Sequence, residues 1–206
     1  KAARVTDAGL RGVTLSAGFA VVHGGFPLSE GRGLAEELLS SAKRGGQEAR
    51  VEGGDVPAMV DFAVVLDAKM DSLAARRRRE CVFQAPDGKT FTLTRKPYRL
   101  TEDGPAGQPC LARVQEKAKE LATCGVARSK IKALREILRE GPDERSDRLA
   151  PYRREGAKWK RLEGLMGWHL EKTDNGQKEA FLDVLEVYDF LMPNDETAQA
   201  PAARED

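Results

Sequence analysis

The apolar positions between residues 13 and 66 change from one period to another. The stretch Val13–His23 combines small and β-branched residues, and its unbroken apolar run Phe19–Val22 predicts a central strand covered on both faces. In Leu28–Lys43, leucine and alanine recur every three or four residues, which predicts a helix that ends at residues 44–46. Ala58–Leu66 is almost continuously apolar and predicts a second buried strand. Strand, helix and strand together predict a compact α/β unit.

The chain becomes strongly charged after Asp67, and four arginines occupy positions 76–79. Two short runs with strand character, at 81–84 and 90–94, flank a turn sequence that contains Asp-Gly. This arrangement predicts a short hairpin. Prolines and glycines interrupt the chain between residues 97 and 109, which predicts a connector and a domain boundary.

Beyond this boundary the pattern is helical. Apolar residues recur at helical spacing in four segments, at 111–124, 131–138, 159–170 and 181–191, and Ser129 is the expected N-cap of the second. The sequence therefore predicts an α+β fold, in which residues 1–109 form strand, helix, strand and hairpin. Residues 110–195 form an all-helical domain, and residues 196–206 form a disordered tail.

Composition excludes several classes of protein. The 34 Lys and Arg residues balance 33 Asp and Glu, so any contact with nucleic acid must be local. Three widely spaced cysteines and two distant histidines predict neither a zinc site nor a disulfide framework. No apolar run approaches the roughly 18 residues of a membrane span, and the N-terminus has no signal-peptide pattern, so we expect a cytoplasmic protein without membrane contact. Lys1 at the first position suggests a fragment or a processed chain.

One local motif stands out from this background. Ser16-Ala17-Gly18 places a small hydroxyl and a glycine inside a predicted buried strand. Glycine weakens a strand and often marks the close approach of a ligand or of another backbone segment. A simple packing role is the alternative, and the residues alone favour it.

Several segments resemble a known family. The strand Val13–His23, the turn Phe26–Leu28, the helix sequence LAEELLSSAKR and the strand sequence MVDFAVVL are similar to the closing elements of a GGDEF-like palm. This palm belongs to the large subunit of type III CRISPR effector complexes. Two later sequences, LTRKPY at 93–98 and VARSKIKAL at 126–134, resemble that subunit and not a diguanylate cyclase. The resemblance covers roughly residues 13–191 and implies a partial ferredoxin-like palm followed by helices.

In this family the palm joins ATP molecules into cyclic oligoadenylate while the complex holds a target RNA. Two acidic residues in a GGDD hairpin hold divalent metal ions, Mg or Mn, that bridge the phosphates. That hairpin precedes the strand with Ser16, and only residues 1–12 lie before it here. Gly53-Gly54-Asp55 shares letters with the motif, but Val56-Pro57 follows it, so we interpret it as a plain turn. This chain is therefore expected to hold no metal and no catalytic residue.

The resemblance also implies a set of nucleotide-binding residues. Ser16 corresponds to a serine near the adenine, and Gly18 lies two residues along on the same face of the strand. Lys43 corresponds to a cation that contacts the triphosphate, and Arg44 is its neighbour. Ordinary charge at a helix C-terminus is the alternative for both cations.

The implied partners are the other subunits of a CRISPR effector, with guide and target RNA reached through the complex. Two other functions stay open: a non-catalytic scaffold that docks on other subunits, and a GGDEF-type cyclic-dinucleotide signalling domain. The arginines at 76–79 could grip an RNA backbone, but a solvated helix face is the favoured interpretation. We expect the chain alone to turn over no ATP.

Overall fold

The computed structural model describes residues 14–52, 54–65, 67, 69–85, 88–100, 109–140, 142–173 and 176–191. The predicted tail at 196–206 and Gly53 of the predicted turn lie outside these residues. In the part of the chain that is described, no helix has both the length and the apolar composition needed to cross a bilayer.

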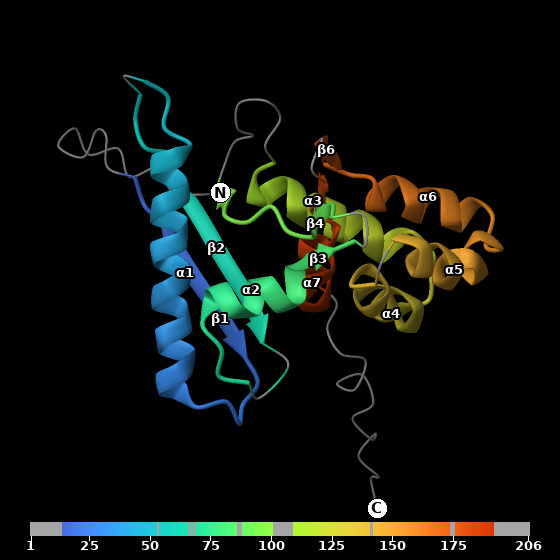
Figure 1. Cartoon of the computed structure of the whole chain (residues 1–206), viewed down its shortest axis with the longest axis horizontal. Helices are drawn as coiled ribbons and strands as arrows, with labels where there is room; N and C mark the ends of the chain where they lie inside the picture. The colour runs from blue at the N-terminus through green and yellow to red at the C-terminus, as the bar shows by residue number, and fades with distance from the viewer. Residues whose placement is uncertain are drawn as a thin grey trace, which may run out of the picture.

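The first sheet is built on the predicted strand, helix and strand. β1 (Ala17–Val22) pairs in parallel with β2 (Met59–Val65), and α1 (Leu28–Glu48) connects them and covers one face of the sheet (Figure 1). β5 (Tyr98–Arg99) adds to the other edge of β2 in antiparallel direction, so the order is β1-β2-β5. The central strand is therefore β2, which is buried on both faces as its sequence predicts.

β1 does not have the central position predicted for it. No other described strand pairs with its outer edge, and the face turned away from α1 is open. The side chains of Leu15, Phe19 and Val21 are 74%, 55% and 38% exposed. An apolar run thus predicted burial on both faces, but in the described chain only the face toward α1 is covered.

Helix α1 is longer than predicted, because Gly45 and Gly46 do not end it. A Cβ atom on Gly45 would collide with the ring of Pro97, and one on Gly46 would lie 3.1 Å from Val56. The two glycines therefore let α1 pack closely against segments that are distant in sequence. The helix ends only after Glu48, where the Ala49 N–H donates to the Gly45 carbonyl.

A second sheet joins the two predicted domains. After α2 (Leu73–Cys81), the predicted hairpin forms as β3 (Val82–Gln84) and β4 (Thr90–Thr92). An unpredicted hairpin, β6 (Glu171–Thr173) and β7 (Gly176–Lys178), extends it in the order β3-β4-β7-β6. Gly176, at φ 150°, comes so close to the Thr90 backbone that no side chain fits there. The stretch predicted as all-helical thus also contributes two strands.

Five helices make up the rest of the fold. They are α3 (Leu111–Thr123), α4 (Arg128–Leu138), α5 (Pro142–Arg153), α6 (Ala157–Met166) and α7 (Phe181–Leu191). Ser129 lies inside α4 and does not cap it, because the helix begins one residue earlier and its N-cap is Ala127. α7 packs against α3 and α4, and its residues Phe181, Leu182, Val184, Leu185 and Tyr188 are buried. The predicted α+β class is confirmed.

Two apolar clusters form the interior. The smaller one lies under α1 and contains Leu34, Leu38, Ala63 and Val65. The larger one extends from Phe62 on the opposite face of β2 into the helical part. The central strand β2 therefore connects the two cores, and the helices hold the sheet in place through its second face.

Candidate functional site

The predicted nucleotide-binding residues lie at the junction of β1 and α1. Gly18 faces the helix, and a Cβ atom at this position would lie 2.5 Å from the Ala35 carbonyl oxygen and 2.8 Å from the Leu38 carbonyl carbon. The close approach indicated by the sequence is therefore made by the backbone of α1. Ser16 lies two residues before Gly18 and is half-buried. Alternation along the chain places it toward the C-terminal half of the same helix.

The two predicted cations lie on different flanks of α1. Both are exposed. Lys43 follows Leu39, whose backbone nitrogen adjoins Gly18, by four residues, so it lies on the flank nearest β1. Arg44 instead lines a groove of about 600 Å³ between α1 and α2, together with Ser40 and Ser41. Helical spacing thus favours a place for Lys43 on the Ser16 side of α1, whereas Arg44 lines the groove toward α2.

The LTRKPY segment leads into β5 at the edge of the first sheet, where Pro97 contacts α1 and other residues of the segment are fixed to α7. Asp183 on α7 accepts hydrogen bonds from the Thr94 hydroxyl at 2.8 Å, from the Arg95 backbone N–H at 2.9 Å and from the Tyr98 hydroxyl at 2.5 Å. The Asp183 side chain is fully buried. One carboxylate therefore fixes the backbone and two side chains of the segment at once.

Lys96 completes this network. Its ammonium contacts the carboxylates of Glu186 and Asp183, the latter at 3.4 Å, and lies 4.0 Å from the centre of the Phe62 ring. Burial alone would lower the pKa of Lys96, but the two carboxylates more than offset this and hold the pKa above its ordinary range. Burial, reinforced by Asp183, raises the pKa of Tyr98 well above its usual value. Lys96 is therefore charged and Tyr98 protonated at neutral pH, which suits a structural joint.

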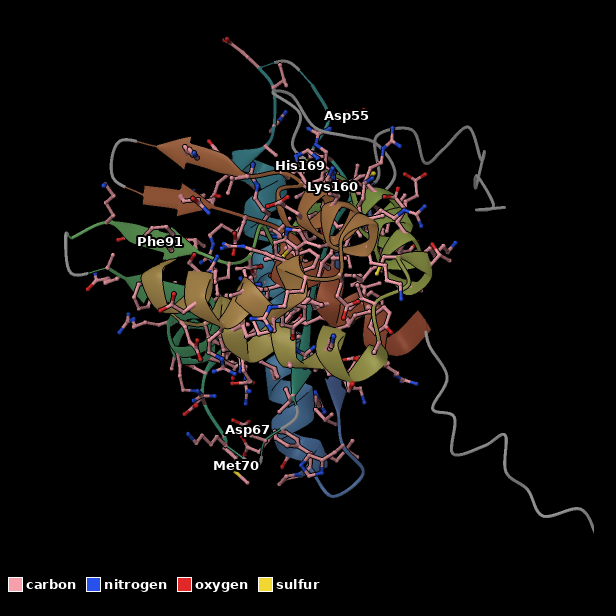
Figure 2. The ribbon with its side chains drawn as sticks, turned by 90° about the vertical axis from the view of Figure 1, so that its right-hand side faces the viewer. Asp55, Asp67, Met70, Phe91, Lys160 and His169 are labelled. Carbon is pink, nitrogen blue, oxygen red and sulfur yellow. The ribbon has the colours of Figure 1, made fainter. Side chains whose placement is uncertain are left out.

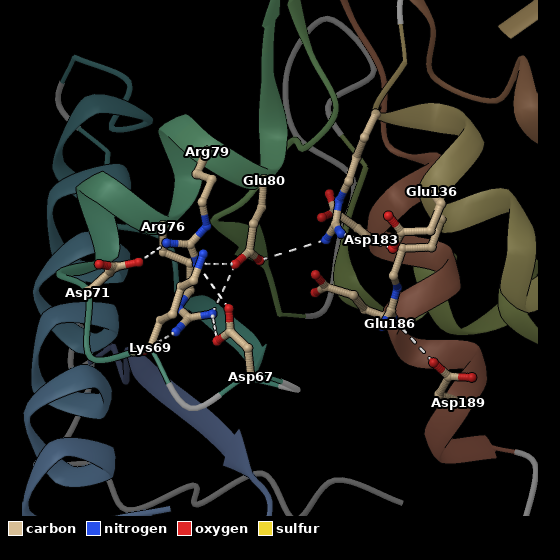
Figure 3. Close-up of polar contacts among 12 residues, drawn as sticks. Asp67, Lys69, Asp71, Arg76, Arg79, Glu80, Glu136, Asp183, Glu186 and Asp189 are labelled. Carbon is tan, nitrogen blue, oxygen red and sulfur yellow. Dashed lines mark hydrogen bonds and ion pairs between the residues drawn. The ribbon is translucent and has the colours of Figure 1, made fainter.

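The arginine run at 76–79 lies on α2 and is largely engaged within the protein. Arg77 donates to both carboxylate oxygens of fully buried Asp61 on β2, at 2.5 and 2.7 Å. Arg76 is only 4% exposed and contacts Asp67 and Glu80 (Figure 3). Arg79 pairs with the same two acids and with Asp71. The favoured interpretation of a solvated face therefore fits only Arg78 well.

A cavity of about 530 Å³ lies between the C-terminal half of α1 and the LTRKPY segment. Basic side chains at positions 77, 95, 96 and 178 line it, beside acidic ones at 48 and 171. Arg95 pairs with Glu171 at 2.5 Å, so the charges of this cavity are mixed. Cys81 also lines it, and burial raises the pKa of its thiol to about 12. A thiol with this pKa is protonated at neutral pH and is no nucleophile.

The segment around Asp55 is a turn. The Gly54 N–H donates to the Val51 carbonyl at 2.9 Å, and Asp55 is exposed. Over the described ranges, no group of three or more His, Cys, Asp or Glu side chains is arranged to hold a metal ion. The location of metal-binding carboxylates outside this chain stays a prediction.

Sequence reasoning missed Asp183, Glu186 and Asp61 as organising residues. A signal was present, because each is an acidic residue inside an otherwise apolar run, where a charge must find a partner. Comparison with models of known protein families gave no match, and a search of curated proteins found no similar sequence. The β1–α1 junction offers the Ser16 hydroxyl and the Lys43 ammonium near an unpaired strand edge, and such groups can bind an anionic ligand.

Proposed function

We propose that this chain forms part of the large subunit of a type III CRISPR RNA-guided effector that acts in the cytoplasm. In this proposal it contributes one wall of the ATP site for cyclic oligoadenylate synthesis. The GGDD-type hairpin that holds the divalent metal is absent from this chain and is supplied by another palm segment. The observation that carries the proposal is the open edge of β1, with Ser16 and Lys43 beside it.

The open edge supports this because an exposed apolar strand needs a partner. Phe19 pairs in register with Phe62, whose side chain is covered, yet Phe19 itself is 55% exposed. An unpaired strand edge with exposed apolar side chains beside it is a template for a further strand. A strand added there would run past Ser16 and the Lys43 flank of α1. Carboxylates on such a strand would share a site with both residues.

The LTRKPY network supports the same proposal from another part of the fold. LTRKPY is one of the sequences that resemble the CRISPR large subunit, and Asp183 and Glu186 bind this segment to α7. The joint holds β5 against β2 and so fixes the sheet relative to the helices. A palm whose sheet is held rigidly can keep two halves of a nucleotide site in register.

The test is cyclic oligoadenylate synthesis by an effector particle that contains this chain, with ATP, Mg²⁺ or Mn²⁺ and a matching target RNA. Lys43→Ala is expected to lower the rate about tenfold or more by weakening ATP binding, and Ser16→Ala to raise the KM for ATP. Arg44→Ala is the matched control, because Arg44 is equally exposed but lines the groove toward α2. Its effect should be small. The isolated chain should form no product.

A scaffold function is the second candidate, and Gly18 favours it, because the backbone of α1 already occupies the close approach that a ligand would use. In that case Lys43→Ala would leave synthesis unchanged in a particle that still assembles. A GGDEF-type cyclic-dinucleotide domain is the third, and formation of a cyclic dinucleotide from GTP would support it. Cyclic oligoadenylate made by the isolated chain would contradict all three.

A further inference from the structure

The turn between α5 and α6 lies at the end of the described part of the molecule farthest from α1 (Figure 1), and several exposed basic residues occur in and around it. Residues 153–163 contain five basic and two acidic side chains, although the whole chain is nearly neutral. The five are exposed and are named here the α5–α6 basic patch: Arg153, Arg154, Lys158, Lys160 and Arg161. Lys160 is labelled in Figure 2, which looks onto this end.

The basic patch differs from the other cationic regions because its charges are not neutralised. Within the described residues, none of the five cations forms an ion pair, and only Arg153 makes a side-chain hydrogen bond, to the Ser146 hydroxyl at 3.2 Å. The two acids of the segment are Glu155 and Glu163. Glu155 forms an ion pair with Lys130 of α4. The five basic side chains of residues 153–163 therefore outnumber the acids, and the segment carries a net positive charge.

The turn that presents the patch is held in one shape. Tyr152 donates to the Lys130 carbonyl at 2.9 Å, and its ring lies 6.5 Å from that of buried Trp159. Gly156 has φ 60° and makes the tight turn before α6 that other residues adopt only with strain. These contacts order the backbone before any ligand binds, which lowers the entropic cost of binding.

The patch continues into a groove of about 440 Å³ between α3 and α6. Lys160, Arg161 and Gly164 form one wall, and Lys117 and Thr123 lie on the other. The acid of the groove, Glu120, is paired with Lys117 at 2.8 Å. Gly164 has no neighbour within 4 Å of its missing side chain, so the groove is open to an approaching ligand.

The composition of the patch favours a phosphate backbone over a protein partner. Protein interfaces have apolar or aromatic anchors and few lysines at their centre. Here Trp159 and Tyr152 point inward, and the large apolar side chains that are exposed on the described surface lie in other elements, Leu170 being next in sequence. Lysine and arginine on a rigid, concave surface suit phosphate groups. No exposed aromatic side chain of the described patch is available to stack on bases.

We propose that the α5–α6 basic patch binds the phosphate backbone of nucleic acid without distinguishing the base sequence. This surface is distant from the proposed ATP site and does not depend on it. About four to five phosphate contacts would make the logarithm of the affinity fall with the logarithm of salt at a slope of about −3.6 to −4.5 for a DNA duplex and about −2.8 to −3.5 for a single strand. RNA and DNA share the backbone chemistry, and the assay separates them.

The experiment measures fluorescence anisotropy of labelled duplex RNA, duplex DNA and single-stranded RNA with the full chain over a range of salt, without ATP. Lys160→Glu/Arg161→Glu is expected to weaken binding about tenfold or more and to reduce the salt slope by about 2. The matched control is Arg32→Glu/Arg78→Glu, which has the same charge change on exposed residues of α1 and α2. Lys160→Gln/Arg161→Gln tests the loss of contact without reversed charge, and circular dichroism checks the fold of each variant.

An equal loss of affinity in the control pair would overturn the proposal, since overall charge alone would then explain binding. Polyglutamate is the test for an acidic protein partner. If it bound as tightly as RNA and lost as much affinity in the Lys160 and Arg161 variants, the patch would be a site for acidic protein and the nucleic-acid proposal would be wrong. A strong preference for one base sequence would also contradict backbone binding. Because no ATP is present, none of these outcomes depends on cyclic oligoadenylate synthesis.

Discussion

The two basic segments of this protein, the arginine run on α2 and the α5–α6 basic patch, have opposite environments. In α2, Arg76, Arg77 and Arg79 contact acids on β2, in the segment before α2 and on α2 itself, and Arg77 reaches a fully buried carboxylate. In the patch, the neighbouring acid Glu155 is paired with Lys130, and the five exposed cations form no ion pair within the described residues. A run of like charges in the sequence therefore does not by itself indicate a structural or a ligand-binding role. The carboxylates that the fold brings to it decide whether it stabilises the protein or remains available to a ligand.

The largest effect that separates the two segments should follow from Arg77→Met. This change leaves the carboxylate of Asp61 buried without its partner, which is expected to lower the free energy of unfolding by about 3 to 5 kcal/mol. Urea denaturation followed by circular dichroism measures it. Arg78→Met is the control, because Arg78 is exposed and should cost under about 0.5 kcal/mol. Equal losses for the two variants would show that Arg77 is no more structural than its neighbour.

A smaller loss is expected from Tyr98→Phe, which tests the joint between sheet and helices. The change removes one of the donors to buried Asp183 and keeps the ring, so the free energy of unfolding should fall by about 1 to 3 kcal/mol. Tyr152→Phe removes a hydroxyl that donates to a neutral carbonyl beside the basic patch, and should cost about 0.5 to 1.5 kcal/mol. If Tyr152→Phe lowered the free energy of unfolding more than Tyr98→Phe, the hydrogen bond beside the basic patch would stabilise the protein more than the one at Asp183.

The sequence predicted the elements that depend on local periodicity and failed where distant contacts decide. β1, α1 and β2 follow from the spacing of apolar residues. The end of α1 does not, because Gly45 is fitted to Pro97, which follows it by 52 residues in the sequence. The hairpin β6-β7 is short and polar, and its pairing partner β4 comes some 80 residues earlier, so no local pattern predicts it.

The candidate site divides in the same way. The close approach at Gly18 was visible in the sequence, because glycine in an apolar strand has few other uses. That the approach is made by α1, and that Lys43 and Arg44 lie on separate flanks, depends on how the helix is rotated over the sheet. The sequence shows the five basic residues of the patch. Only the folded structure shows that they have no ion-pair partners among the described residues.

A pH-dependent effect is expected at Glu155, the acid that anchors the patch. The hydrogen bond from Lys130 lowers the pKa of this carboxyl below its ordinary value of 4.5. A lowered folded-state pKa means that the pair stabilises the protein above about pH 4.5 and that this contribution is lost as the pH falls through the folded-state value. Glu155→Gln should therefore lower the thermal midpoint slightly at pH 7, and the difference from the unchanged protein should shrink as the pH falls below about 4.5. A difference that is the same at every pH would assign the effect to packing.

The smallest effect on stability is expected from the patch cations themselves. Lys160→Gln/Arg161→Gln removes two exposed charges without ion-pair partners in the described chain, so the free energy of unfolding should change by less than about 0.5 kcal/mol. The same variant should still lose nucleic-acid affinity. In α2 the order is reversed, because Arg77→Met should cost stability. If Lys160→Gln/Arg161→Gln proved as destabilising as Arg77→Met, the patch would be another internally engaged segment, and the contrast between the two basic regions would disappear.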